Sequence, residues 1–389
     1  MEVKQLSALL NKIGDELLGK SDIVTEDLQG VVELGQAILN GSSTDNYVKS
    51  LVNHIGKMVF VDRPYYGELL SVLKDNWEFG SIVEKVRMDV ASVAETENES
   101  WDLKNGTSYD PNIFYKPTIT VKFFNNKTAF EIPVSITEMQ VKESFSNSTQ
   151  VNSFVSMIYS AIEKRLNMDV DALIKRTITN FIGETLHADY PDNNYGAKSG
   201  VKAVNLLFLY NKEKKQQLKA AEAITDPEFL RYASMKMANY IDRLGTMSTL
   251  FNIGGKSNQT PKDKLHVVLL SEFIKGAQFY LQSDTWHNEL TKLPLAETVT
   301  FWQGSGVDYT FDKTSAIHVN TASNNEIVAS GILGVMFDHE ALGVSLFNKR
   351  VTTNYNAKAE FINNFYKCEG RYFNDLDENF VVFFIADAA

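Results

Sequence analysis

The first 80 residues contain two stretches in which apolar residues recur three and four positions apart. This spacing places the apolar side chains on one face of a helix, with polar residues opposite. The two stripes are Leu6, Leu9, Leu10, Ile13 and Leu17, then Leu28, Val31, Val32, Leu34 and Ile38. We therefore predict an arm of short helices over residues 1–80, which packs either on the rest of the chain or on another molecule.

Further along, apolar and polar residues alternate, which is typical of β-strands with one buried face. Alternation over residues 85–90 predicts a half-buried strand. Residues 118–123 and 130–136 alternate in the same way, and Asn125-Asn126-Lys127 between them forms a plausible turn. We therefore predict a long β-hairpin over residues 114–145. Because an isolated hairpin is marginally stable in water, this one is expected to lie against another chain or sheet.

The longest helical pattern begins after the potential N-cap residues Ser148 and Thr149 and continues to Gly183 without a proline. Its apolar stripe consists of Val151, Phe154, Val155, Ile158, Ile162, Leu166, Val170, Leu173, Ile174, Ile178 and Phe181. At 1.5 Å per residue, such a helix is roughly 50 Å long. This length predicts a scaffold element of the fold.

The remaining pattern mixes both kinds of element, so the fold class is α+β. We predict a strand over residues 204–209, a helix that opens at Asp226-Pro227, a strand over 266–270 and a helix over 272–281. Apolar runs after residue 330 predict mostly strands.

Composition narrows the class of protein. Hydrophobic residues make up 44% of the 389 residues and charged residues 22%, as in ordinary folded proteins. The net charge of −11 argues against nucleic-acid binding as the main role, although it permits a position next to DNA. A single cysteine, Cys368, rules out an intrachain disulfide and favours a reducing compartment. We expect neither a signal peptide nor a membrane-spanning segment.

The sequence offers little catalytic chemistry. The six histidines lack the spacing of metal ligands, and Asp338-His339-Glu340 is expected to be a solvated turn rather than an ion site. Gly255-Lys256-Ser257 lacks the earlier glycine of a phosphate-binding loop, and we interpret it as a polar loop. Cys368 is expected to fill space between strands, and the basic run 212–219 to be a solvated helix face. We therefore predict no catalytic, cofactor-binding or metal-binding residues and no enzymatic activity.

The order of the elements is more informative than any single residue. An arm, a long hairpin, a very long helix, a mixed region and closing strands resemble the major capsid protein of tailed bacteriophages, with its HK97-type shell fold. Its closing part is similar to residues 331–342, 349–356, 360–365 and 371–383, and the front of small podophage capsid proteins is similar to residues 51–56 and 80–84.

The resemblance implies five parts. They are an N-terminal arm (1–80), a strand with an extended loop (81–147), a peripheral domain with a spine helix (148–215), an axial domain (216–340) and return strands of the peripheral domain (341–389). The extended loop would overlap a neighbouring subunit. Some relatives crosslink a lysine of that loop to a neighbour, for which Lys122 and Lys127 are candidates by position alone.

The resemblance also implies a function and partners. The chain would be a structural protein that self-assembles as pentamers and hexamers into the icosahedral or prolate head of a phage, assembled in the bacterial cytoplasm. It would enclose double-stranded DNA without reading its sequence, bind separate scaffolding and portal proteins, and need no cofactor and no membrane. We expect such a subunit to bend at the root of the hairpin and in Asp192-Asn193-Asn194 to fit both settings.

Three alternatives stay open at the level of the sequence, and one of them is a phage tail or baseplate component. An encapsulin-like compartment shell resembles the same fold but encloses an enzyme. An intracellular hydrolase with dispersed catalytic residues, for example around His339 or His318, would show none of the familiar motifs.

Overall fold

The computed structural model describes residues 69–74, 83–88, 100, 102–112, 116, 118–137, 148–282, 296–302, 316–321, 325–359 and 361–387. The chain divides into two compact units. The first comprises residues 1–64, 135–163 and 354–363, and the second comprises residues 65–134, 164–353 and 364–389. The predicted helices of the arm lie outside the described residues.

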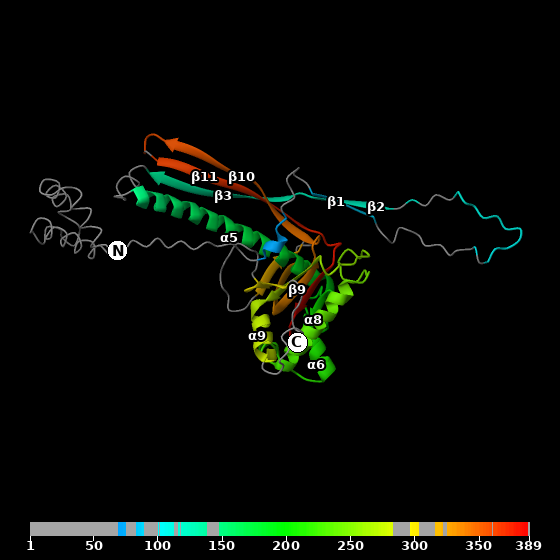
Figure 1. Ribbon diagram of the computed structural model, residues 1–389. Helices are drawn as coiled ribbons and strands as arrows, with labels where there is room; N and C mark the ends of the chain where they lie inside the picture. Colours follow the sequence, from blue (N-terminus) through cyan, green and yellow to red (C-terminus); the bar gives the residue numbers. More distant parts are fainter. Residues whose placement is uncertain are drawn as a thin grey trace, which may run out of the picture. The chain divides into compact units, whose positions relative to one another are not determined.

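The second unit is built on a five-stranded sheet in the order β4-β12-β9-β5-β6 (Figure 1). Its strands are β4 (Ala203–Asn205), β5 (Leu265–Leu270), β6 (Ala296–Val299), β9 (Ile332–Asp338) and β12 (Phe380–Phe384). The pairs β4–β12 and β5–β6 are parallel, whereas β9 is antiparallel to both of its neighbours. Every residue of β9 and β12 is buried, which explains why both read as continuous apolar runs instead of alternating.

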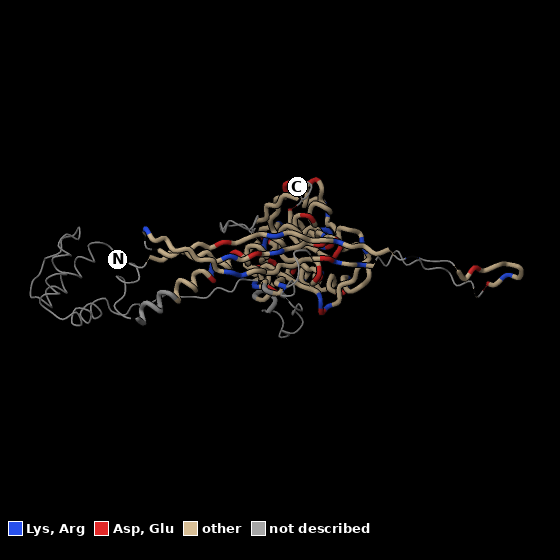
Figure 2. Tube along the Cα trace, turned by 90° about the horizontal axis from the view of Figure 1, so that it is seen from above, with Lys and Arg blue, Asp and Glu red and all other residues tan. Residues whose placement is uncertain are grey.

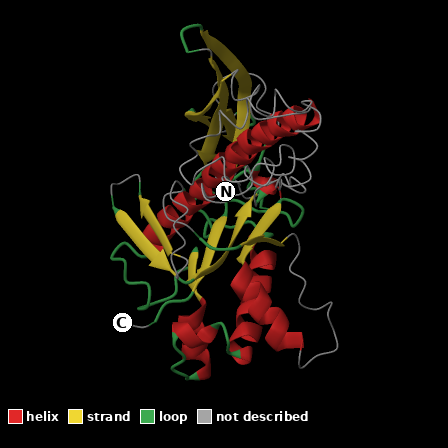
Figure 3. Cartoon of the chain, turned by 90° about the vertical axis from the view of Figure 1, so that its left-hand side faces the viewer, coloured by secondary structure: helices red, strands yellow, loops and turns green. Residues whose placement is uncertain are grey.

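Helices cover this sheet. They are α6 (Leu206–Lys214), α7 (Ala220–Ala223), α8 (Pro227–Leu244) and α9 (Ser271–Gln282), and α6 and α9 contact β12 and β5 respectively (Figure 3). As predicted, α8 opens at Asp226-Pro227, and the Asp226 side chain caps it by accepting a hydrogen bond from the Phe229 amide. The predictions for β5, α9 and the closing strands are also confirmed.

The predicted long helix is confirmed as α5 (Ser148–Asp189), which continues six residues past Gly183. From Val170 to Leu186 its apolar side chains are buried, and Phe181 stacks on Phe380 of β12 with ring centroids 4.0 Å apart. Thr177 and Thr185 are also buried, and each hydroxyl donates to the carbonyl four residues earlier. This local bonding satisfies polar groups that would otherwise be costly to bury.

The predicted strand over 204–209 is wrong after its first two residues. The strand β4 ends at Asn205, and α6 begins at Leu206. The Asn205 side chain accepts a hydrogen bond from the Phe208 amide at 3.1 Å and thereby caps the helix. A short apolar run does not distinguish a buried strand from a buried helix. Here the N-cap residue Asn205 favours a helix from Leu206 onward.

The predicted pairing of the 114–145 hairpin is also wrong. The strand β2 (Ile119–Phe124) pairs with β1 (Val83–Met88), not with β3 (Asn126–Thr137). Instead, β3 belongs to a three-stranded sheet in the order β10-β11-β3, with β10 (Leu342–Asn356) and β11 (Phe361–Asn374). Asn125 therefore joins two sheets and is no hairpin turn. Alternation identified the strands, but it carries no information about their partners.

Three small elements complete the described residues. The 3-10 helix η1 (Leu70–Val72) leads to a parallel bridge between Leu73 and Val344. The strands β7 (Ala316–Asn320) and β8 (Glu326–Ser330) form an antiparallel pair.

Candidate functional site: the root of the ribbon

The strands β1 and β2 form a two-stranded antiparallel ribbon with two chemically different faces. Its register pairs Val86 with Val121 and Met88 with Ile119, so these side chains share one face. This outer face consists of one acidic residue, Glu84, and five apolar ones, Val86, Met88, Ile119, Val121 and Phe123, and all six are exposed. The opposite, inner face is less exposed and consists of Val83, Lys85, Arg87, Thr120, Lys122 and Phe124. The half-buried strand predicted over 85–90 therefore buries its polar side chains and exposes its apolar ones.

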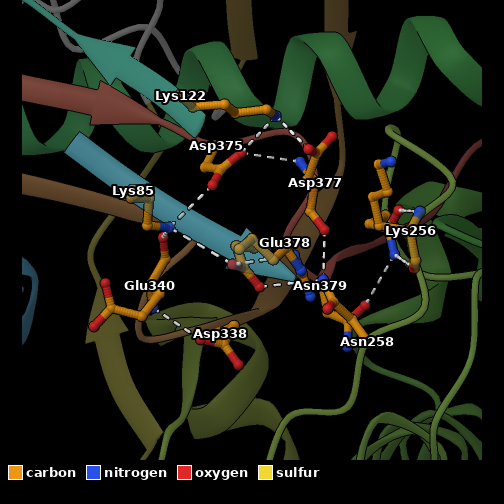
Figure 4. Close-up of polar contacts among 12 residues, drawn as sticks. Lys85, Lys122, Lys256, Asn258, Asp338, Glu340, Asp375, Asp377, Glu378 and Asn379 are labelled. Carbon is orange, nitrogen blue, oxygen red and sulfur yellow. Dashed lines mark hydrogen bonds and ion pairs between the residues drawn. The ribbon is translucent and has the colours of Figure 1, made fainter. Parts of the chain in front are cut away.

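The cations of the inner face meet an acidic loop, residues 375–378, between β11 and β12 (Figure 4). The two carboxylate oxygens of Asp375 lie 3.0 Å from Lys85 Nζ and 3.0 Å from Lys122 Nζ. Glu378 lies 3.6 Å from Lys85 and 3.4 Å from Arg87, and Asp377 also pairs with Lys122. We call these six charged residues, Lys85, Arg87, Lys122, Asp375, Asp377 and Glu378, the root cluster.

All six residues belong to the second unit. Figure 2 shows basic and acidic residues interspersed along the trace of the chain. A cavity of about 350 Å³ beside the root cluster is lined by side chains of both charges, including Lys256 and Glu340. Lys85 also donates to the Glu340 carbonyl at 2.6 Å, which adds a contact to the turn after β9.

The acidic loop is held in place by backbone bonds. The Asp375 amide donates to the Ala341 carbonyl at 2.7 Å, and the amides of Ile253 and Gly254 both donate to the Leu376 carbonyl. The Asn258 side chain donates to the Asp377 carbonyl. Position 254 is a glycine because a β-carbon there would clash with the carboxylate of Asp377. The body therefore holds the backbone of the acidic loop through contacts that do not involve the ribbon.

The environment shifts the pKa values of these groups in different directions. Burial alone raises the pKa of the Asp375 carboxyl, but Lys85 and Lys122 outweigh burial and hold the pKa below its ordinary value. Burial raises the pKa of Glu378, and Lys85 and Arg87 offset this only in part. Burial lowers the pKa of Lys122, but its bonds to Asp377 and Asp375 raise it overall. The surroundings therefore stabilise the ionised form of Asp375 and the protonated form of Glu378.

Sequence reasoning missed one pair of histidines. His266 Nε2 lies 2.8 Å from His339 Nδ1, and the two rings stack. The pKa of each ring is lowered, first by burial, then by His339 in the case of His266 and by Lys74 in the case of His339. The two residues are 73 positions apart in sequence, and only the pairing of β5 with β9 brings them together.

The turn Asp338-His339-Glu340 is present, but it is only partly solvated. Asp338 is buried and accepts a hydrogen bond from the Glu340 amide at 2.8 Å, whereas Glu340 is exposed and pairs with Lys74. These three side chains therefore do not converge on one ion. Within the described residues, no group of three or more His, Cys, Asp or Glu side chains could hold a metal ion.

The other sequence candidates take ordinary places. Cys368 is buried, as the sequence predicts for a packing role, and burial raises the pKa of its thiol. The start of the basic run, from Lys212, is exposed on α6. Of the two crosslinking candidates, Lys122 belongs to the root cluster and Lys127 is exposed in β3. His318 is exposed in β7. Among the described helices, none is long and apolar enough to cross a membrane.

The ion pairs of the root cluster hold the ribbon against the body, and the outer face of the ribbon exposes apolar side chains. This arrangement suits positioning the ribbon and binding another surface. Comparison with known structures identifies the fold. The chain matches a chain in a capsid structure of Staphylococcus phage Andhra with a TM-score of 0.53 and 8% sequence identity, covering 85% of this chain and 87% of that one. A structure of the head fiber and inner core protein gp22 of native bacteriophage P68 gives a TM-score of 0.54 and 8% identity, covering 85% and 88%. The fold is the α+β fold of HK97-type phage capsids.

Sequence comparison identifies the family. No curated protein matches the chain. The profile of the Phi29-like phage major capsid protein family matches residues 7–384, nearly the whole length. The chain therefore belongs to the Phi29-like phage major capsid protein family, and it is a structural protein of the phage head shell.

Proposed function

We propose that the outer face of the β1–β2 ribbon docks on a second copy of the chain and thereby links the subunits of the shell. The observation that supports this is the exposure of that face: Val86 is 63% exposed and Phe123 is 64% exposed. A ribbon of two strands has no core of its own in which to bury them. An apolar patch on an assembling subunit is typical of a protein interface.

The shell that results encloses double-stranded DNA without reading its sequence. The net charge of −11 supports a wall that does not grip phosphates. Its subunits are arranged as pentamers and hexamers, assemble in the bacterial cytoplasm with scaffolding and portal proteins, and catalyse no reaction. The division into arm (1–80), extended loop (81–147), peripheral domain (148–215), axial domain (216–340) and return strands (341–389) is part of this proposal, with the β1–β2 ribbon as the extended loop.

A photocrosslinking experiment tests the docking. A benzophenone amino acid replaces either Val121, which points outward, or its neighbour Thr120, which points inward. We expect intermolecular dimers after irradiation of assembled particles carrying the probe at position 121, and far fewer with the probe at position 120. Closed shells that give no dimer from position 121 would contradict the docking, and a chain that stays monomeric at every concentration would contradict assembly itself.

The contents of the particles test whether the shell encloses DNA or a protein cargo. The family assignment favours a phage head over the encapsulin-like alternative, and the two differ in what they enclose. We expect particles from infected cells to contain nuclease-protected double-stranded DNA. Particles that hold a protein cargo and no DNA would support the encapsulin alternative instead.

A further inference from the structure

The ribbon reverses the usual placement of charged and apolar side chains. Charged groups normally stay in water and apolar groups are buried. Here Lys85, Arg87 and Lys122 turn inward. Val86, Val121 and Phe123 turn outward. The described contacts of the inner face with the body include ion pairs and one ring contact, between Phe124 and Phe373 with centroids 5.2 Å apart.

Ionic attachment has a specific physical consequence. Because Lys85 and Lys122 each donate to a different oxygen of Asp375, only one position of the ribbon satisfies both. Apolar contacts are non-directional and would tolerate sliding. Both partners of each pair are at least half-buried, so water weakens these pairs less than it weakens surface ion pairs.

The carboxylate side of these pairs is rigid. The acidic loop connects the long strand β11 to the fully buried strand β12, and the Leu376 carbonyl accepts from two successive amides at 3.0 and 2.9 Å. The Phe380 amide donates to the Phe251 carbonyl just beyond the loop. A ribbon bound to this loop takes its direction from the core of the second unit.

We propose that the root cluster is an electrostatic latch that fixes the direction of the ribbon in the free subunit, before the outer face meets a second copy. This inference rests on the proposed docking and adds what sets the direction of the ribbon before docking. The latch keeps residues 83–88 and 119–124 in one orientation, so the bending that different shell positions require does not fall within these residues. Our expectation from the sequence placed bending at the root of the 114–145 hairpin, which does not form as a hairpin.

The test measures ribbon direction in the unassembled full-length subunit. Spin labels are placed at Met88, exposed at the far end of β1, and at Glu228, exposed on α8, in a Cys368→Ala background. Pulsed electron resonance then gives the distribution of distances between the labels. We expect Lys122→Glu to broaden this distribution and abolish its main peak, because a third carboxylate would repel Asp375 and Asp377.

Two controls separate the latch from a general effect of charge or folding. Lys116→Glu makes the same charge change at an exposed position outside the root cluster and should leave the distribution unchanged. Lys122→Arg keeps the cation and should retain the main peak. Circular dichroism confirms that each variant keeps its folded body, and Lys85→Met provides a second disruption should Lys122→Glu not fold.

The proposal is overturned by a distribution that stays the same in Lys122→Glu, or by one that broadens equally in Lys116→Glu. These outcomes are independent of docking, since the labels report on single subunits and the crosslink at position 121 reports on particles. If Lys122→Glu leaves the distance distribution unchanged but the crosslink at position 121 forms, only the latch is wrong. If the distribution broadens as expected but no crosslink forms, only the docking is wrong.

Discussion

At the scale of the residue, buried polar side chains hold this fold in specific places. Asn205 is the clearest case, because it is fully buried and every part of its amide is used. Its oxygen caps α6, and its nitrogen donates to the carbonyls of Tyr195 and Ala386 at 2.9 and 3.0 Å. One side chain thus ties a helix start, a loop and the end of the chain after β12 together.

We expect Asn205→Ala to lower the free energy of unfolding by about 2–3 kcal/mol, because it removes a helix cap and leaves two partly buried carbonyls without their donor. Chemical denaturation of the unassembled subunit measures this loss. Asn211→Ala, which changes the same residue type in a half-buried loop contact, should cost less. Equal losses in the two variants would contradict the central role of Asn205.

Asp375 predicts a definite dependence of stability on pH. The pKa of its carboxyl is lower in the folded protein than in the unfolded chain, so its stabilising effect is complete above the ordinary carboxyl pKa and disappears as the pH falls through the lowered value. We expect Asp375→Asn to cost roughly 2 kcal/mol at neutral pH. The difference from the unmodified protein should shrink in acid, as measured by denaturation at a series of pH values.

The dependence of stability on pH that we expect from Glu378 is opposite to that from Asp375, and it serves as a control. Its pKa is raised in the folded protein, so ionisation of Glu378 lowers stability as the pH rises through the raised value. Glu378→Gln should therefore compare more favourably with the unmodified protein at neutral pH than in acid. Parallel pH curves for the two variants would show that the pKa shifts have been assigned wrongly.

At the scale of the element, spacing alone predicted the long helix α5, the cap of α8 and the closing strands, because each depends on local sequence. Spacing did not predict the features that depend on contacts with residues far away in the sequence. The alternation in β1 and β2 revealed two faces but not which one meets the body, since the acidic loop that attracts the cations lies about 250 residues or more away. The root cluster and the pair His266–His339 were hidden for the same reason.

Gly334 in β9 tests how tightly the central sheet is packed. A β-carbon at this position would lie 2.8 Å from the Val268 carbonyl oxygen of the neighbouring strand β5. We expect Gly334→Ala to lower the free energy of unfolding by about 1–3 kcal/mol, because the strands would have to separate. Thermal unfolding measures the loss, with Gly245→Ala as the comparison, because Gly245 has a negative φ and room for a β-carbon. An effect no larger than that of Gly245→Ala would contradict such close packing.

At the scale of the whole molecule, the subunit is chemically complete on one side of its ribbon and incomplete on the other. The inner face has its counter-charges within the chain, whereas the exposed outer face does not share a core with any other described element. Membership of a head-shell family fits this division of roles, because the missing surface can come from other copies.

The concentration needed for assembly should report on the outer face. Burying an exposed phenylalanine contributes about 1.5–3 kcal/mol, and each 1.4 kcal/mol is a factor of about ten in an equilibrium constant. We expect Phe123→Ser to raise the threshold concentration for shell formation at least about tenfold, and Phe123→Leu to change it little. Light scattering against concentration measures the threshold. Equal threshold concentrations for Phe123→Ser and Phe123→Leu would show that Phe123 does not take part in the contact between subunits.

The same ribbon makes newly synthesised chains hazardous to one another. A strand pair with valine, isoleucine and phenylalanine side chains in water invites irregular stacking, which competes with ordered growth of the shell. An infected cell that makes this chain in large amounts must therefore keep the unpaired form scarce or shielded. Overproduction of the chain by itself should yield amorphous precipitate alongside any particles, and Phe123→Ser should make that precipitate smaller.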